Sequence, residues 1–171
     1  MRPQVVATLP AMPRVNGTPA LRPSWDEWAL GLADAVARRA DCTRRQVGAV
    51  ALAPDHRVLG TGYNGLRAGV PGCATAGACP RGQVSYDQIP AGATYVAGEG
   101  VCPALHAEEN CAFYLSSEQR RGATLYVTDA PCPNCTRLLA GSGFARVVWR
   151  DEDGIFERDL LNPAAHPRRC D

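Results

Sequence analysis

The sequence predicts an α/β fold in which helices cover both faces of a mixed β-sheet. Two observations support this architecture. Apolar patterns of strand length alternate with patterns of helical period in the second half of the chain, and a β-hairpin pattern precedes them. The 171 residues are enough for one domain with its own core. We therefore expect a three-layer α/β/α sandwich.

The first predicted helix follows a proline-rich arm. Residues 1–23 carry several prolines and no periodicity, so we expect this arm to be poorly ordered. Ser24 and Glu27 then match a capping box, and apolar residues recur at helical spacing to about residue 40. This pattern predicts a helix from residue 25 that packs one face against the sheet.

A hairpin and a long insert come next. Apolar runs at 47–52 and 57–63 flank a Pro-Asp turn, which is typical of paired strands. Residues 65–101 are rich in Gly, Pro, Ala and Cys, and so long a loop in a compact domain is usually a functional lid or is held by a metal. The later elements are predicted as a helix at 104–117, a strand at 124–128, a helix at 133–140, a strand at 145–149, a short helix at 155–161 and a tail at 163–171.

Composition narrows the classes of protein that fit. The net charge of +1 gives no overall field that would favour nucleic acid or a membrane surface. No apolar stretch is long enough to span a membrane, and the start of the chain lacks a signal-peptide core. The eight cysteines without a secretion signal indicate reduced thiols. We expect a cytoplasmic protein that does not bind membranes.

Three candidate metal ligands stand in the second half of the chain. His106 is followed, 25 residues later, by Pro131 and then by Cys132 and Cys135. One imidazole and two thiolates supply three of the four ligands of zinc, and a catalytic site leaves the fourth position to water. The pattern H-x-E followed by P-C-x-x-C is the signature of zinc deaminases that act on nucleobases. Glu108 is the glutamate of that pattern.

The spacing of these residues also predicts where the metal lies. His106 and Glu108 converge only if the metal lies off the first turn of a helix, because successive helical residues are about 100° apart. Cys132 and Cys135 share a face if Pro133 opens the next helix. Both groups then lie at helix N-termini, where the dipole should lower thiol pKa values. Two thiolates largely neutralise the cation, so the bound water should be less acidic and a general base is needed nearby. Glu108 is the candidate for this base. It would move protons from the water to the ring nitrogen and to the departing ammonia.

An alternative is a non-catalytic, zinc-stabilised regulatory module. In that case a fourth protein ligand would close the site, and Glu108 would be an ordinary charge at a helix start. No fourth ligand accompanies the three in sequence, and the intact glutamate argues against this hypothesis.

Four short stretches occur in an order that is typical of one family. They are TRRQVGAV at 43–50, TGYNG at 61–65, HAEEN at 106–110 and PCPNC at 131–135. With these stretches the chain resembles the deoxycytidylate (dCMP) deaminases of the cytidine deaminase-like superfamily. The resemblance implies a five-stranded sheet, zinc-dependent conversion of dCMP to dUMP and ammonia, and a homo-oligomer. Many members of the family also respond to dCTP and dTTP.

The resemblance also assigns substrate contacts. It implies that Asn64 contacts the substrate and that the Ala107 backbone N–H helps recognise the base, while Tyr63 could border the sugar. Phosphate recognition should use arginine, whose planar fork suits bidentate contacts. Arg45 precedes the first strand and Arg67 stands near Asn64, where the family usually has a proline, so both are candidates.

Four further cysteines suggest a second metal. Resembling proteins often carry thiols in this part of the chain, and some bind a second, structural zinc. Four thiolates would close such a site and hold down the insert. The alternative is that the thiols are inert and partly buried. The residues concerned are Cys42, Cys73, Cys79 and Cys102.

The sequence leaves several nucleobase compounds as possible substrates. The same chemistry would act on CMP, a nucleoside, guanine, or a base within tRNA or DNA. An enzyme that acts on polymeric nucleic acid should have a basic groove with aromatic side chains. A net charge of +1 and an aromatic content of 6% count against that substrate class.

Overall fold

Six strands form one mixed sheet in the order β4-β3-β5-β6-β7-β8. The computed structural model describes residues 14–15, 18–19, 22–77, 79–83, 101–162 and 164–170. The strands are β3 (Gly48–Leu52), β4 (Val58–Tyr63), β5 (Thr124–Val127), β6 (Arg146–Asp151), β7 (Gly154–Asp159) and β8 (Arg168–Arg169). The helices are α1 (Trp25–Ala37), α2 (Cys73–Ala76), the 3₁₀-helix η1 (Pro80–Gln83), α3 (Ala107–Phe113), α4 (Ser117–Arg120) and α5 (Pro133–Ser142).

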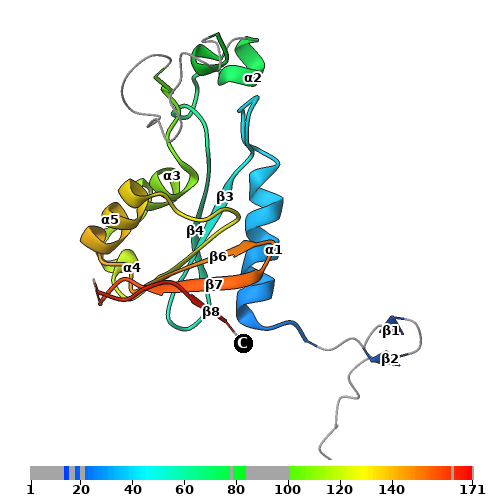
Figure 1. Cartoon of the computed structure of the whole chain (residues 1–171), viewed down its shortest axis with the longest axis vertical. Helices are drawn as coiled ribbons and strands as arrows, with labels where there is room; N and C mark the ends of the chain where they lie inside the picture. Colours follow the sequence, from blue (N-terminus) through cyan, green and yellow to red (C-terminus); the bar gives the residue numbers. More distant parts are fainter. Residues whose placement is uncertain are drawn as a thin grey trace, which may run out of the picture.

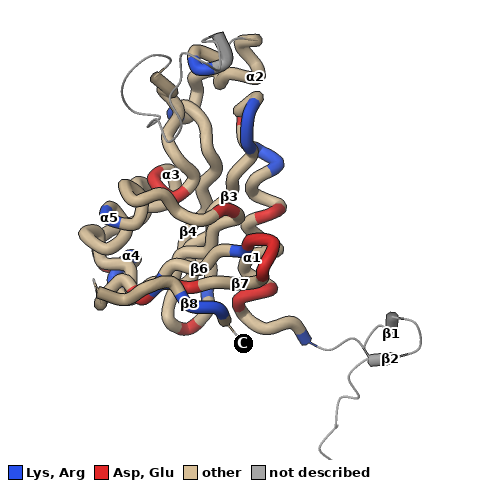
Figure 2. Tube along the Cα trace, in the orientation of Figure 1, with Lys and Arg blue, Asp and Glu red and all other residues tan. Residues whose placement is uncertain are grey.

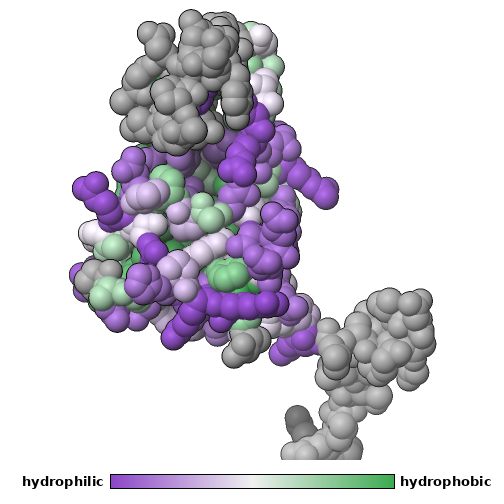
Figure 3. All heavy atoms as spheres, in the orientation of Figure 1, coloured by the Kyte–Doolittle hydropathy of each residue, from purple (hydrophilic) through white to green (hydrophobic). Residues whose placement is uncertain are grey.

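The helices cover the sheet on two sides, which confirms the three-layer sandwich. Figure 1 shows α1 on one side of the sheet and α3, α4 and α5 on the other. The β5–β6 pair is parallel and the other pairs are antiparallel, so the sheet is mixed as predicted. Hydrophilic side chains cover most of the described surface on the face in Figure 3. No described helix has the length and apolar character needed to cross a membrane.

The period-2 pattern of β3 builds both halves of the core. Val50 and Leu52 pack with Ala29, Leu30 and Ala33 of α1 in one buried cluster. The intervening alanines of β3 belong to the second cluster, with the buried face of α3 and with α5. Alternate residues of a strand point to opposite faces, so one central strand serves both layers.

Two glycines let the helices approach the sheet. A Cβ at Gly48 would lie 2.1 Å from the carbonyl oxygen of Ala33 in α1. A Cβ at Gly62 would lie 2.4 Å from the carbonyl oxygen of Ala107 in α3. Any side chain at Gly62 would therefore displace the helix that begins next to His106.

Most of the predicted elements are confirmed, with shifted ends. Glu27 N–H donates to the Ser24 hydroxyl and Ser24 N–H donates to the Glu27 carboxylate, so the capping box at α1 is present. The helix predicted at 104–117 is shorter, because the Leu105 backbone pairs with Gly65 and only residues from Ala107 onward are helical. α4 is a separate turn of helix.

The short helix predicted at 155–161 is wrong. These residues lie largely in β7, which pairs antiparallel with β6 through a tight turn in which Gly154 has a φ of 137°. Ile155 packs against the α1 side and Phe156 against the other side, which is the alternation of a strand. In the predicted tail, Arg168–Arg169 adds β8 to β7. The sheet therefore has six strands where the resemblance implied five.

Parts of the arm and of the insert lie outside the described residues. Within the arm the described residues are β1 (Arg14–Val15), β2 (Thr18–Pro19) and residues 22–23, and β1 and β2 pair with each other. The expectation of a poorly ordered arm therefore falls mostly outside the described residues. Within the insert, α2 and η1 are described and residues 84–100 are not.

Candidate active site

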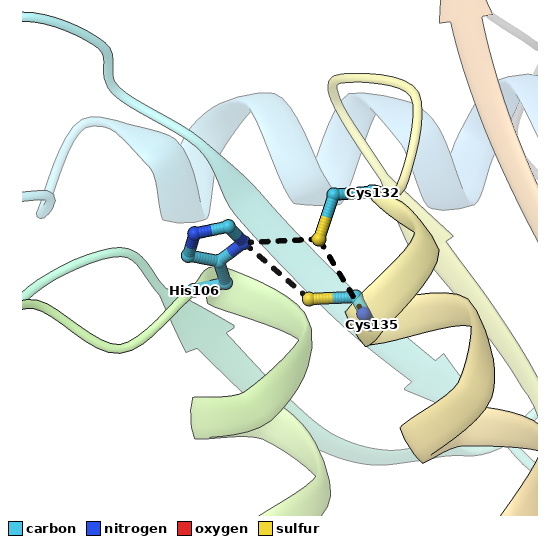
Figure 4. A group of neighbouring side chains, drawn as sticks. All are labelled: His106, Cys132 and Cys135. Atoms are coloured by element: carbon cyan, nitrogen blue, oxygen red, sulfur yellow. Dashed lines mark hydrogen bonds between the residues drawn. The ribbon is translucent and has the colours of Figure 1, made fainter. Parts of the chain in front are cut away.

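Three potential metal ligands converge between the N-termini of α3 and α5. His106 is the N-cap residue of α3, and Cys132 is the N-cap residue of α5, with Pro133 in the first helical position. The Nδ1 atom of His106 lies 3.4 Å from the Sγ of Cys135 and 3.7 Å from the Sγ of Cys132 (Figure 4). The three side chains therefore meet at two helix starts, which is the place where the spacing predicts a metal ion.

These ligand atoms fit a zinc ion. One atom from each residue lies within 4.8 Å of the other two, and among the described residues this is the only group of three or more such side chains. One imidazole nitrogen and two sulfurs are donors that zinc prefers, and three protein ligands leave one coordination position for water or substrate. The chemistry of the donor set therefore matches a catalytic zinc site.

Burial acts on the Cys135 thiol in the direction opposite to the one predicted for a helix N-terminus. Its side chain is 1% exposed, and this burial, followed by the charges of Glu108 and Cys132, raises the pKa of the thiol. In the absence of a metal ion, desolvation therefore acts against the lowering that the helix N-terminus was predicted to cause. A bound cation would itself have to displace the proton from this sulfur.

Two adjacent glutamates at the start of α3 have different tasks. Glu109 accepts a hydrogen bond of 2.8 Å from the His106 backbone N–H, so it caps the helix and fixes the ligand-bearing residue. Glu108 is 4% exposed, and its burial raises the pKa of the carboxyl above the ordinary value. A carboxylate whose pKa is raised is a stronger base than an ordinary one, which suits a group that accepts and returns a proton.

A cavity of about 190 Å³ lies over these residues. His106, Glu108 and Cys132 line it from the metal site. Its other walls come from the segment before β3, from the start of α3 and from the insert. They include Arg45, Asn64, Arg81, Leu105, Ala107 and Asp129.

The structure brings three of the five predicted substrate-binding residues to this cavity. Ala107 is the first residue of α3, where a helix leaves its N–H without an intrahelical acceptor, and Asn64 and Arg45 line another wall. Tyr63 and Arg67 are exposed and are not among the described residues that line the cavity.

Asn64 also has a structural task that the sequence did not reveal. Its side-chain NH₂ donates to the Arg45 carbonyl at 2.9 Å, and its oxygen accepts from the Val47 N–H at 2.8 Å. Asn110 of α3 donates to the Tyr63 carbonyl at 2.7 Å. The two amides therefore tie the end of β4 to the segment before β3 and to α3.

The four cysteines of the predicted second site line the same cavity. Burial raises the pKa of Cys73, and the charges of Cys79, Cys102 and Cys42 raise it further, which shows that the four sulfurs are neighbours. Asp41 holds the turn that carries Cys73 by accepting hydrogen bonds of 2.8 Å from two backbone N–H groups of that turn. These four sulfurs nevertheless do not form a group as close as the ligand atoms of His106, Cys132 and Cys135, which lie within 4.8 Å of one another.

Sequence reasoning missed two charged residues of the cavity. Asp129 follows β5 and forms an ion pair with Arg45, with 3.3 Å between Oδ2 and Nη1. Arg81 lies in η1 and is 5% exposed. The proximity of Asp129 to the Pro-Cys motif was an available signal, whereas no pattern in the insert pointed to Arg81.

The fold and the site together define a zinc-dependent hydrolytic deaminase with a cytidine deaminase-like fold. Residues 23–150 match the family described as the cytidine and deoxycytidylate deaminase zinc-binding region, and the chain belongs to this family. The resemblance drawn from the four sequence stretches is confirmed.

Individual relatives agree with this assignment. The chain is 50% identical over 131 residues to the deoxycytidylate deaminase of Mycobacterium phage D29, covering 77% of this chain and 98% of that one. It is 33% identical to the deoxycytidylate deaminase of Saccharomyces cerevisiae, of which it spans 39%. The crystal structure of apo dCMP deaminase from cyanophage S-TIM5 is similar in fold, with a TM-score of 0.53 and 24% identity over 76% of this chain and 85% of that one.

Proposed function

We propose that the protein hydrolyses dCMP to dUMP and ammonia. The observation that carries this proposal is the burial of Glu108 in the same cavity that His106 and Cys132 line. The 50% identity to a phage deoxycytidylate deaminase supports the choice of substrate. A further structure of the cyanophage S-TIM5 enzyme, with 23% identity and a TM-score of 0.53, is described as a complex with dCMP and dUMP.

The chain supplies a proton carrier and an orienting group for this reaction. Zinc held by His106, Cys132 and Cys135 would supply Lewis-acid activation of the attacking water. Glu108 accepts a proton from that water as the C4–O bond forms, and it returns the proton to N3 of the base. Glu108 then takes the remaining hydroxyl proton to the amino group, the C4–N bond breaks, and ammonia leaves. The Ala107 N–H donates to the base and fixes its orientation.

A panel of substrates tests the assignment. The zinc-loaded protein is incubated separately with dCMP, CMP, deoxycytidine, cytidine, dCTP, guanine and a short single-stranded DNA, and ammonia release is measured. We expect the highest kcat/KM for dCMP. Reaction of the nucleosides alone would contradict the phosphate assignment, and reaction of the oligonucleotide alone would contradict the whole proposal.

We infer that Cys42, Cys73, Cys79 and Cys102 hold a second, structural zinc. Their shared cavity and the mutual effect of their thiols on the pKa of Cys73 support this inference. Elemental analysis should give about two zinc ions per chain, and about one in Cys73→Ser. Cys170→Ser, which changes a thiol in another part of the structure, is the matched control. One zinc per wild-type chain would contradict the second site.

We further propose that the enzyme is a homo-oligomer. Two aromatic side chains at the end of α3, Phe113 and Tyr114, are 56% and 72% exposed, and aromatic residues are enriched in protein interfaces. Light scattering coupled to size-exclusion chromatography measures the molar mass directly, and a monomeric mass would contradict this proposal.

Regulation by dCTP and dTTP is proposed from the family resemblance. We expect dCTP to raise and dTTP to lower the rate at dCMP concentrations below KM. Assays with each triphosphate check this, and unchanged rates would contradict it.

We infer that residues 24–162 act as one cytoplasmic deaminase domain. A single sheet with a core cluster on each face supports one domain, and cysteines that hold metal ions as thiolates suit a reducing compartment. Limited proteolysis should leave this domain intact.

A further inference from the structure

Arg81 and Glu108 are the two buried charged side chains among the residues that the structure describes. Arg81 is 5% exposed and Glu108 is 4% exposed, and both line the same cavity. They come from different parts of the chain, because Arg81 lies in η1 of the insert and Glu108 lies in α3. The two least solvated charges of the described chain are therefore walls of one site.

Burial changes how strongly an arginine binds an anion. The guanidinium stays protonated in any protein environment, and moving it out of water costs several kcal/mol unless hydrogen bonds and opposite charges offset the loss. A guanidinium that is already dehydrated attracts an anion more strongly than a solvated one, because the surrounding medium screens the interaction less. Its planar fork of donors also matches two oxygens of a phosphate group.

Arg45, another arginine of the cavity, is solvated instead. The Arg45 side chain is 72% exposed, and it lies 3.3 Å from the Asp129 carboxylate. Exposed ion pairs of this kind are worth at most about 1 kcal/mol. Figure 2 shows further basic residues in the segment between α1 and β3. These residues are arginines, and they are exposed. Arg81 is the buried one.

We propose that Arg81 binds the 5′-phosphate of the nucleotide substrate and so makes the enzyme select nucleotides over nucleosides. This inference rests on the proposed deamination of dCMP, and it adds the residue that determines the specificity of that site. Arg81 contacts the phosphate, which is remote from the reacting C4 atom, while Glu108 transfers protons at the base.

The test compares Arg81→Gln with wild type on two substrates, using zinc-loaded protein. The kcat/KM for dCMP should fall about 100-fold, as expected for a lost bidentate charge-assisted contact, while the kcat/KM for deoxycytidine should change less than about threefold. Calorimetry should show the same selective loss for the products, with weaker binding of dUMP and unchanged binding of deoxyuridine. Arg39→Gln, an exposed arginine after α1, is the matched control and should leave both substrates unaffected.

Three results would contradict the proposed role of Arg81 or the proposed substrate. Equal losses for dCMP and deoxycytidine, with zinc content and melting temperature retained, would mean that Arg81 acts on Glu108 or on the insert and would overturn the proposal. If Arg81→Gln fails to fold, Arg81→Lys keeps the charge without the fork and should lower the ratio of dCMP to deoxycytidine activity about tenfold; an unchanged ratio would overturn the proposal. A wild-type enzyme with no preference for dCMP would refute the proposed substrate before any variant is made.

Discussion

The carboxyl groups of Asp26 and Glu108 are respectively half-buried and buried, and their surroundings shift their pKa values in opposite directions. Asp26 in α1 accepts a hydrogen bond of 2.7 Å from Arg146 and one of 2.9 Å from the Tyr126 hydroxyl. Burial alone would raise its pKa, but these hydrogen bonds and the Arg146 charge outweigh it and hold the pKa below its ordinary value. At Glu108 burial dominates, and the pKa is raised.

This difference separates Asp26, whose charge stabilises the fold, from Glu108, whose carboxyl takes part in the reaction. Arg146 also binds Glu157 of β7, and Glu157 binds Arg168 of β8, so this ion network joins α1 to one end of the sheet. A carboxylate that receives hydrogen bonds and opposite charge from neighbouring side chains stays ionised and holds the elements that carry them together. A buried carboxyl with a raised pKa gains and loses a proton easily, which suits catalysis. The two regions should therefore respond differently to the same kinds of change.

Removal of the metal should have the largest effect on activity of all the changes considered. Treatment with a chelator should lower the rate of dCMP deamination to background, because the Lewis-acid function is lost, and added zinc should restore it. The melting temperature should fall as well, since an ion that binds only the folded state stabilises it. Full activity in protein shown by elemental analysis to lack zinc would contradict the assignment of His106, Cys132 and Cys135.

Glu108→Ala should remove the proton carrier and leave the metal ligands in place. We expect a loss of at least about 1,000-fold in kcat, near the upper range for general acid–base groups, with zinc content unchanged. Ammonia release and elemental analysis on the same preparation check both parts. Residual activity within tenfold of wild type would show that another group carries the proton.

Asp26→Asn should show the reverse pattern. The variant removes the negative charge opposite Arg146, which we expect to lower the free energy of unfolding by about 1–3 kcal/mol. The kcat/KM of the folded enzyme should stay within about twofold of wild type, because Asp26 is not among the described residues that line the cavity. Urea unfolding and steady-state kinetics measure the two quantities, and a large loss of activity without loss of stability would refute the separation of the two regions.

The sequence could predict the features that depend on local pattern. The capping box of α1, the hairpin and the three metal ligands each have a signature within a few residues. The metal site was predictable in three dimensions as well, because a proline at the start of α5 and the spacing of Cys132 and Cys135 determine where their side chains lie.

Features that depend on contacts between distant segments were not predictable. β7 is a strand because it pairs with β6, and the Asp-Gly signal of the turn before it was the available clue. The bond between Asp26 and Arg146 joins residues 120 positions apart. Arg81 is buried although the sequence of the insert has no periodicity and resembles that of a solvated loop.

The pH dependence of stability should give the smallest and most specific difference between the two regions. Because the pKa of Asp26 is lowered on folding, its ionised form adds stability above the ordinary value of 3.8, and this contribution is lost as the pH falls through the folded pKa. The gap in unfolding free energy between wild type and Asp26→Asn should therefore be full at pH 7 and should shrink below about pH 4. Urea unfolding of both proteins at a series of pH values measures this gap. A gap of the same size throughout the series would mean that Asp26 acts by shape and hydrogen bonding alone, and that its charge is not what distinguishes it from Glu108.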